Sequence, residues 1–285
     1  MSSLVEVGEG VWVRTSERFV TNTTVVRLAG ASCLVVDPAV DPDDLAELVA
    51  ALASVSLDVA AGWSTHPHWD HVLWSSGLGA DVPRYATAVN ARHCRDHRDK
   101  VMARLAEASA GHELDLCARL TAVDLDAAGL ARFELELGLG IGSGIGSGIG
   151  SGLTSSAGRC RVIEHSAHAR GHGALFFPDL GLFVAGDMAS DIEIPLLDSH
   201  PVDPVGDYLA ALRQYEALIG SVTTFIPGHG AIGDGRELER RIAADRAYLS
   251  DLVSGRPSDD PRLATAWLAT EHERHLALVR TRALP

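Results

Sequence analysis

The feature that constrains this chain most is a cluster of metal-binding residue types directly after an apolar run. Residues 64–71 read Ser-Thr-His-Pro-His-Trp-Asp-His, so three imidazoles and a carboxylate lie within six residues. The preceding run, Val59–Trp63, predicts a buried strand that ends in a polar turn. Because alternate residues of an extended chain share a face, His66 and His68 project together. Such nitrogen and oxygen ligands suit zinc, iron or another borderline divalent ion, and a group of solvated loop histidines is the weaker interpretation.

Hydrophobic periodicity along the rest of the chain predicts strands and helices in two batches. The predicted strands are Leu4–Val7, Val11–Arg14, Val20–Leu28, Ser32–Val36, Val59–Trp63, Phe133–Leu137, Arg161–Glu164, Ala174–Phe177, Leu182–Ala185 and Val222–Ile226. The predicted helices are Asp43–Ser54, Pro204–Ile219, Arg236–Leu252 and Arg262–Leu276. Each batch of strands is followed by helices, which indicates an α/β (α+β) fold of two similar halves packed sheet to sheet.

Three segments depart from this pattern, but no linker separates independent domains, so we expect one domain over residues 1–285. Residues 86–128 look helical and polar, and an insertion there could cover a pocket. Residues 138–153 form a GIGS repeat that is too rich in glycine to pack, which predicts a flexible loop. We expect a helical extension at about 234–285.

Composition limits the expected partners and compartment. The chain has 38 acidic and 24 basic side chains, a formal charge of −14, which argues against a nucleic-acid partner, and no run of Arg or Lys suggests a local basic groove. The four cysteines form no CxxC pair, which is typical of reduced thiols in the cytoplasm. No secretory signal and no run of roughly 18 apolar residues is visible, so we expect a cytoplasmic protein without a membrane partner. Lys100 is the only lysine, and we attribute the excess of arginine to codon bias.

The His-x-His-x-Asp-His pattern at 66–71 resembles the signature of the metallo-β-lactamase superfamily. Further motifs of that family follow in the right order: His168 in Ser-Ala-His-Ala, Asp187 in Val-Ala-Gly-Asp and His229 in Pro-Gly-His-Gly. The resemblance covers residue 4 to about residue 250. It implies an αββα sandwich of two packed mixed β-sheets flanked by helices.

The resemblance also implies two divalent metal ions, zinc in the first place, with iron or manganese as alternatives. The implied ligands are His66, His68 and His168 for the first ion, Asp70, His71 and His229 for the second, and Asp187 as the bridge between them. A hydroxide between the ions would be the nucleophile at neutral pH. Asp70 would also have a catalytic role, as a proton carrier.

One departure from the family pattern concerns the third histidine. Where relatives commonly have Gly-His-Thr, this chain has an alanine on each side of His168, so a hydroxyl that could orient a ligand is missing. His172 could take over that role or line the substrate pocket. We also expect Trp69 at the pocket as an apolar wall, and His200 from the loop after Asp187.

The other histidines are assigned to the surface or to a structural role. His93 and His97 lie four residues apart on a predicted helix among charged neighbours, which favours a solvated face over a metal pair. We expect His165 to be structural, and His112, His272 and His275 to be superficial.

The motifs favour some activities of the family over others. True β-lactamases of the superfamily generally have a cysteine or serine near the position of Asp187, so this aspartate disfavours a β-lactamase. The nuclease branch has a further histidine motif between the bridging aspartate and the last ligand, where only His200 occurs here. Glyoxalase II-like members usually have a longer, basic C-terminal helical region. The remaining prediction is a dinuclear metal-dependent hydrolase that cleaves a small ester-like substrate, such as a lactone, thioester or carboxylic ester.

Two further hypotheses stay open. A mononuclear iron sulfur dioxygenase would hold its metal through His68, His168 and Asp187, although the complete second ligand set argues against it. A binding or scaffold protein on a decayed enzyme fold is the weakest hypothesis, because a decayed site would be free to lose ligands. We expect a small-molecule substrate, and the sequence leaves its identity and the oligomeric state open.

Overall fold

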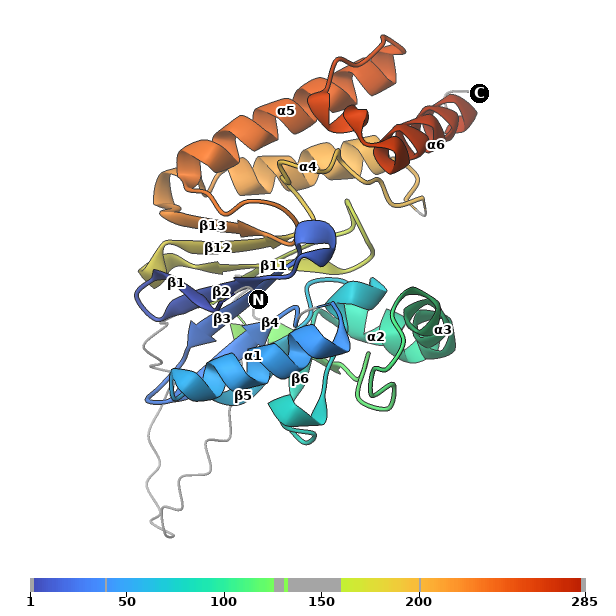
Figure 1. Ribbon diagram of the computed structural model, residues 1–285. Helices are drawn as coiled ribbons and strands as arrows, with labels where there is room; N and C mark the ends of the chain where they lie inside the picture. The colour runs from blue at the N-terminus through green and yellow to red at the C-terminus, as the bar shows by residue number, and fades with distance from the viewer. Residues whose placement is uncertain (1–2, 39, 126–130, 133–159, 200, 283–285) are drawn as a thin grey trace.

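Two β-sheets lie face to face, and helices cover the outer side of each (Figure 1). The computed structural model describes residues 3–38, 40–125, 131–132, 160–199 and 201–282. Helix α1 (Pro42–Ser54) lies below the first sheet, while α4 (Pro204–Glu216) and α5 (Gly235–Ser254) lie above the second (Figure 1). This order of layers confirms the predicted αββα sandwich.

The first sheet has seven strands in sequential order, antiparallel from β1 to β4 and parallel from β4 to β7. These strands are β1 (Val5–Gly8), β2 (Val11–Thr15), β3 (Asn22–Arg27), β4 (Ser32–Val36), β5 (Asp58–Trp63), β6 (Arg84–Ala86) and β7 (Thr121–Ala122). The periodicity predicted β1 to β5 to within two residues. It missed β6 and β7, because three and two residues are too few for an alternating pattern to be visible.

The second sheet has four strands, antiparallel except for the parallel pair β12 and β13. These strands are β10 (Arg161–His165), β11 (His172–Phe177), β12 (Leu182–Gly186) and β13 (Thr224–Pro227). A separate pair is formed by β8 (Asp124–Leu125) and β9 (Ala131–Arg132). The strand predicted at Phe133–Leu137 and the repeat at 138–153 lie outside the described residues.

The segment 86–128, which looked helical throughout, is helical only in its first half. Helices α2 (Ala88–Asp96) and α3 (Arg98–Ala108) follow β6, but turns and β7 follow α3. Gly111 has a φ of 96°, which no continuing helix accommodates. Cys117 and Ala118 then pack against α3 residues in a small apolar cluster. Because the segment lacks long apolar runs, its periodicity did not reveal this return to the sheet.

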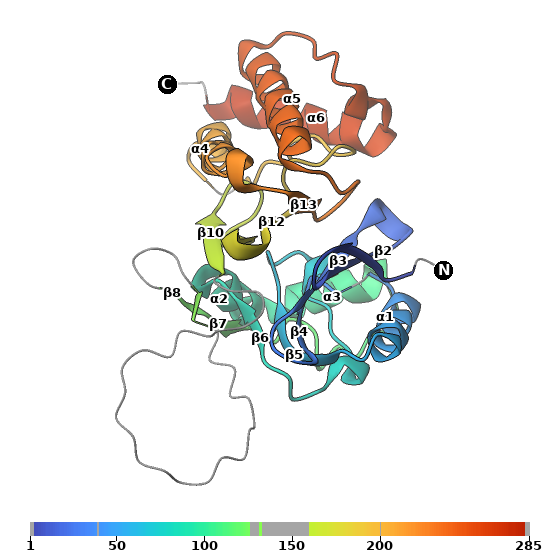
Figure 2. The same ribbon diagram turned by 90° about the vertical axis from the view of Figure 1, so that its left-hand side faces the viewer.

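Apolar side chains fill the spaces between the layers. The largest groups are represented by Trp63 and Leu175 between the sheets, Phe183 and Leu249 between the second sheet and its helices, and Val35 and Leu48 between the first sheet and α1. Figure 2 shows α6 (Ala266–Arg282) with α4 and α5 on the outer side of the second sheet. The polar site residues described below follow strand ends, where the chain leaves this core.

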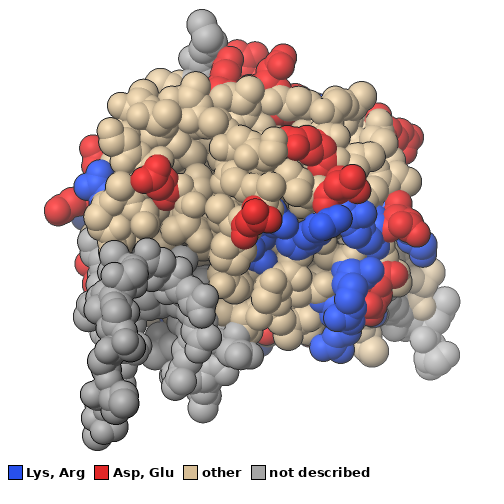
Figure 3. All heavy atoms as spheres, turned by 90° about the horizontal axis from the view of Figure 1, so that it is seen from below, with Lys and Arg blue, Asp and Glu red and all other residues tan. Residues whose placement is uncertain are grey.

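The surface carries a local basic groove, although no run of Arg or Lys in the sequence suggests one. Figure 3 shows Lys and Arg side chains gathered on part of the lower face. Arg84, Arg92 and Arg119 are among the residues that line a groove of about 770 Å³. They come from β6, from α2 and from the loop before β7, so no basic run marks them in the sequence. All four cysteines are buried and free, and no helix of the described residues is long and apolar enough to cross a bilayer.

A buried ion-pair network ties the C-terminal helices to the loop after β12. The side chain of Arg262, which lies between α5 and α6, is 6% exposed and contacts Asp245 at 2.7 Å and Asp260 at 2.6 Å. It also donates a hydrogen bond of 2.8 Å to the carbonyl of Glu193. Burial raises the pKa of Asp245 to about 6, although Arg262 opposes that shift. At neutral pH the buried Asp245 carboxylate therefore depends on this guanidinium.

Replacement of this guanidinium should be costly. Arg262→Ala leaves the buried Asp245 charge uncompensated, so we expect the free energy of unfolding at pH 7.5 to fall by about 3–5 kcal/mol in chemical denaturation. Arg256→Ala removes the exposed pair between Arg256 and Asp251 and should cost no more than about 1 kcal/mol. Equal losses of unfolding free energy in the two variants would show that Arg262 does not compensate a buried charge at Asp245.

Candidate metal centre

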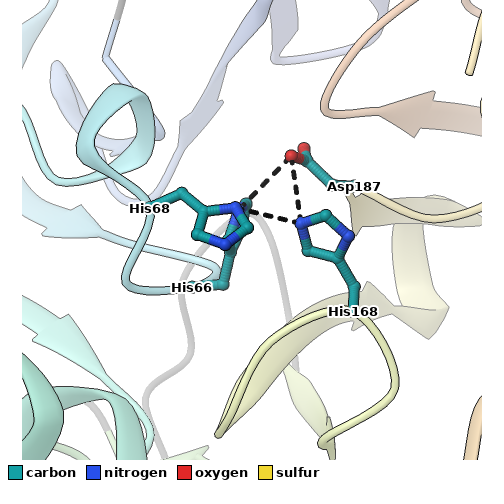
Figure 4. A group of neighbouring side chains, drawn as sticks. All are labelled: His66, His68, His168 and Asp187. Carbon is teal, nitrogen blue, oxygen red and sulfur yellow. Dashed lines mark hydrogen bonds and ion pairs between the residues drawn. The ribbon is translucent and has the colours of Figure 1, made fainter. Parts of the chain in front are cut away.

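Four side chains from three turns form the first cluster of donor atoms (Figure 4). His66 and His68 follow β5, His168 lies in the turn between β10 and β11, and Asp187 follows β12. His68 Nδ1 lies 2.9 Å from His66 Nε2 and 3.1 Å from His168 Nε2. Asp187 Oδ2 lies 3.3 Å from His66 Nε2 and 3.5 Å from His168 Nε2. Three nitrogens and one oxygen therefore surround one point.

A second cluster lies beside the first. Asp70 and His71 belong to the 3₁₀ turn Trp69–His71, and His229 follows β13. The Nε2 atoms of His71 and His229 are 3.2 Å apart. Each of these nitrogens lies 3.5 Å from Asp70 Oδ2. The structure thus brings together all seven residues expected as ligands, in the two expected groups.

Asp187 contacts both clusters. In addition to its contacts with the first, its Oδ1 lies 3.2 Å from His71 Nε2 and its Oδ2 lies 3.2 Å from His229 Nε2. Two glycines permit this position. A Cβ on Gly228 would overlap Asp187 Oδ1, and a Cβ on Gly186, which has a φ of 60°, would overlap the ring of His172. A side chain at either glycine would therefore displace the carboxylate or its surroundings.

The separations fit a divalent cation in each cluster. Ligand atoms around a tetrahedral zinc ion lie about 3.3 Å from one another, given Zn–N distances of 2.0–2.1 Å. The separations above run from 2.9 to 3.5 Å. Asp187 Oδ1 is buried and makes no well-aligned hydrogen bond with a described residue, although His71 Nε2 lies 3.2 Å away, so this oxygen is accessible to a cation that replaces the proton of His71. Imidazole and carboxylate donors suit zinc, iron and manganese.

Asp37, which follows β4, orients one ligand ring in each cluster. Its Oδ2 accepts a hydrogen bond from Thr65 Oγ1 at 2.6 Å and lies 2.9 Å from His71 Nδ1, within ion-pair distance. The Thr65 hydroxyl has donated its only hydrogen to Asp37, so its oxygen accepts from His66 Nδ1, 3.0 Å away. Both His66 and His71 therefore direct Nε2 at the clusters. Hydrogen bonds of this kind fix the tautomer and orientation of metal-binding histidines.

His229 is oriented by residues around the start of β3. Its Nδ1 lies 3.1 Å from the carbonyl oxygen of Phe19 and 3.2 Å from Thr21 Oγ1. Because a carbonyl can only accept, Nδ1 carries a hydrogen and Nε2 points to the site. Asn22 Nδ2 donates to the carbonyls of Pro227 and Gly230 at 3.0 and 2.8 Å, which holds the end of β13 against the first sheet.

In the second cluster, protonated histidines balance the negative charge of the carboxylates. Burial by itself would raise the pKa of Asp70 and Asp187, but the imidazoliums of His71 and His229 outweigh it, and the pKa of Asp70 falls to about 2. Burial would lower the pKa of the two histidines, but Asp187 outweighs it and raises the pKa of His229 to about 9 and that of His71 well above its usual value. A cation bound here would take the place of these protons.

The first cluster is arranged differently. Burial lowers the pKa of His66 well below its usual range and that of His168 to about 3, and the neighbouring imidazoles act in the same direction. These rings are therefore neutral at pH 7, as imidazole must be to bind a metal ion.

Sequence reasoning missed two carboxylates at this centre. Glu193, in the loop after β12, lies with Asp187 and His229 in a third group whose ligand atoms are all within 4.8 Å of one another. Burial raises the pKa of Glu193 to about 7, while His229 opposes the shift. No motif marks Glu193. Asp37 had a signal that went unused, since it is a carboxylate at the end of an apolar strand beside β5.

The missing hydroxyl next to His168 leaves a gap in the hydrogen bonding, and His172 does not fill it. His168 Nδ1 is buried and has no partner among the described residues, and the same holds for both ring nitrogens of His172. His172 is fully buried, with its ring stacked between His66 at 5.3 Å and His165 at 4.5 Å between centroids. The expectation that His172 orients a ligand or lines the pocket is therefore corrected: it packs behind the ligands as a neutral ring.

A cavity of about 810 Å³ opens beside the first cluster. His68, Asp70 and His168 line it, and Trp69 forms part of its wall, where the sequence placed it. His200, also expected at the pocket, lies outside the described residues.

Three other histidines lie elsewhere than expected. His93 and His97 line this cavity instead of facing solvent alone, because α2 ends beside it. His275 is fully buried rather than superficial: its Nε2 accepts from the Leu197 amide at 3.2 Å, and its Nδ1 lies 3.0 Å from the Tyr248 hydroxyl. His165 is structural as expected, 2.8 Å from the hydroxyl of Tyr215.

Comparisons with known proteins agree with this geometry. The family described as the metallo-beta-lactamase superfamily matches residues 17–229. The chain resembles the crystal structure of a metallo-beta-lactamase from Erythrobacter litoralis, with a TM-score of 0.55, 18% identity, and coverage of 84% of this chain and 94% of that one. It also resembles metallo-beta-lactamase FIM-1 from Pseudomonas aeruginosa in its mono-zinc form, with a TM-score of 0.58, 14% identity, and coverage of 87% and 96%. A comparison with curated protein sequences gave no match.

The role of Asp37 can be tested through metal affinity. Asp37→Asn places an amide where a carboxylate accepts from Thr65 and contacts His71 Nδ1, so the rings of His66 and His71 lose a fixed orientation. We expect the affinity for zinc to fall about 10–100-fold in competition with a chromogenic chelator. The surface variant Asp207→Asn on α4 serves as control, and an unchanged affinity of Asp37→Asn would show that the carboxylate is dispensable.

Metal binding at the second cluster should depend on pH. His229, with a pKa raised to about 9, is protonated at pH 7.5 and must lose that proton to bind a cation. The apparent affinity should therefore rise as the pH increases from 6 to about 9, with release of at least one proton per ion in that cluster. Calorimetry in two buffers of different ionisation enthalpy counts these protons, and an affinity that is constant over this range would contradict the assignment.

Proposed function

This chain belongs to the metallo-beta-lactamase superfamily, and we propose that it is a dinuclear, metal-dependent hydrolase of a small ester-like substrate: a lactone, thioester or carboxylic ester. The proposed metal is zinc, with two ions per chain. His66, His68 and His168 would hold one ion, Asp70, His71 and His229 the other, and Asp187 would bridge them.

The observation that carries this proposal is the position of Asp187. One carboxylate lies within 3.5 Å of four imidazole nitrogens that belong to two clusters. A shared anion between two groups of donors is what a pair of adjacent dications needs, because it screens their repulsion. The complete second set supports two ions over the single iron of a sulfur dioxygenase.

Bound ions of this kind polarise a carbonyl and lower the pKa of water from 15.7 to about 7. The chain itself contributes position and proton transfer. Asp70 is the most exposed carboxylate of the clusters, with 12% of its side chain accessible, and it lies between His71, His229 and the cavity. We assign to Asp70 the transfer of a proton between the attacking water and the leaving group, in addition to its place as a ligand.

The cavity supports a small substrate. Its volume of about 810 Å³ is that of a pocket for a small molecule, and it has apolar walls at Trp69 and Leu197. The likeness to β-lactamase structures lies below 20% identity and carries the fold only. β-Lactams therefore enter as one class of compound in the test.

The test combines metal analysis with a substrate screen. Protein purified without chelators should contain about two zinc ions per chain by elemental analysis. It should hydrolyse at least one member of a panel of chromogenic lactones, thioesters and esters faster than β-lactams. Asp187→Ala and His229→Ala should each reduce kcat/KM by at least about 100-fold, because each removes a ligand from the metal pair.

The matched control is Asp207→Ala, which removes an exposed carboxylate from α4 and should leave the rate unchanged. Full activity in either ligand variant would exclude the dinuclear mechanism. About one iron per chain, together with oxygen uptake in the presence of a persulfide, would favour the dioxygenase instead.

A further inference from the structure

The cavity beside the metal centre has a basic side that the metal ligands do not explain. Lys100 and Arg104 reach the cavity from α3, and Arg170 reaches it from the turn after His168. All three side chains are exposed. Lys100 and Arg170 form no ion pair with any described residue, and Arg104 has only an exposed pair of 3.9 Å with Glu107.

The acidic residues of the cavity do not cancel this charge. Asp70 belongs to the second metal cluster. Glu271 is paired with Arg274 at 2.6 Å, so these two side chains neutralise each other. Asp198 is the one remaining carboxylate among the lining residues. Three cations therefore line the cavity together with one further carboxylate, in a chain whose formal charge is −14.

Apolar side chains line the same cavity. Trp69 and Leu197 form part of its wall, and Trp267 of α6 lines it while keeping 47% of its surface exposed. An exposed tryptophan in a cavity wall provides a flat apolar contact for a ligand. The cavity wall thus combines candidate metal ligands, apolar side chains and cations.

We infer that the substrate is an amphipathic anion whose ester-like group meets the metal centre and whose terminal carboxylate or phosphate pairs with Lys100, Arg104 and Arg170. This inference rests on the proposed hydrolase activity, because it names the substrate class of that same site. Guanidinium and ammonium groups form charge-assisted hydrogen bonds with both kinds of anion. Exposed cations beside a reaction centre also attract an anionic substrate from solution.

The kinetic test compares two esters of equal length. p-Nitrophenyl hydrogen adipate ends in a carboxylate, whereas p-nitrophenyl hexanoate ends in a methyl group. For the zinc-loaded protein we expect kcat/KM to be at least about tenfold higher for the adipate, which corresponds to about 1.4 kcal/mol. The double variant Lys100→Met/Arg170→Gln should lose this preference through KM and hydrolyse the hexanoate within twofold of the wild-type rate.

Arg92→Gln is the matched control, since Arg92 lies on α2 and lines the separate basic groove. It removes one positive charge from the protein without touching the cavity, so the preference for adipate should persist. Equal preference in the wild type and the double variant would overturn the inference. A preference that falls as far in Arg92→Gln would also overturn it, because net charge would then be the cause.

A second measurement needs no turnover. Lys100 is the only lysine, so reductive methylation with ¹³C-formaldehyde gives one lysine signal, which Lys100→Met identifies by its loss. N-Butyl adipamic acid and its terminal phosphonate analogue should shift this signal, and neutral N-butyl hexanamide should not. The ratio of the two anion affinities distinguishes carboxylate from phosphate recognition.

These outcomes separate the two proposals. A shift with the anions but no ester hydrolysis would retain the anion site and reject the hydrolase. Hydrolysis without any anion preference or shift would retain the hydrolase and reject the anion site.

Discussion

The metal centre depends on one buried carboxylate that is not itself a ligand. Asp37 contacts the ring of His71 directly at 2.9 Å and, through the Thr65 hydroxyl, sets the orientation of His66. It can do so because β4 and β5 are parallel neighbours, so Asp37 and the 64–71 turn emerge at the same sheet edge. One side chain thus couples both groups of donors to the pairing of two strands. A change in the register between β4 and β5 would therefore move Asp37 relative to the ligands that it orients.

A concentration of charge in a protein interior is stable only when each charge has a partner. In the second cluster Asp70 and Asp187 are balanced by His71 and His229, whereas the first cluster is built from neutral imidazoles around the Asp187 carboxylate. The centre lies where strand ends of the two sheets meet, and the apolar layers remain intact around it. The loop after β12 is held in turn by Arg262 from the C-terminal helices. The site is thus held in place by residues of both sheets and by Arg262 of the C-terminal region.

Local pattern was sufficient for the long strands and for the ligand motifs. The Val59–Trp63 run and the His-x-His-x-Asp-His spacing each depend on neighbours in sequence, and β5 ends at the residue predicted.

What the sequence did not reveal depends on long-range packing. Glu193 reaches the centre because the Ser190 hydroxyl bends the loop around it, and Asp37 reaches it through strand pairing. His172 and His275 carry polar rings yet are fully buried, since His172 stacks between His66 and His165 and His275, on α6, packs against Tyr248 of α5. The two-residue strand β7 is recognised only by its pairing with β6, because two residues are too few to show an alternation of apolar and polar side chains.

Helices α3 and α6 are far apart in the sequence but border the same cavity, and neither supplies a residue to the two clusters of donor atoms. Helix α6 also lies beyond the residues that match the family, which end at 229. Substitutions on these two helices can therefore change the wall of the cavity while the seven candidate ligands stay in place. With this architecture, the range of ligands that fit the cavity can change through one helix independently of the other.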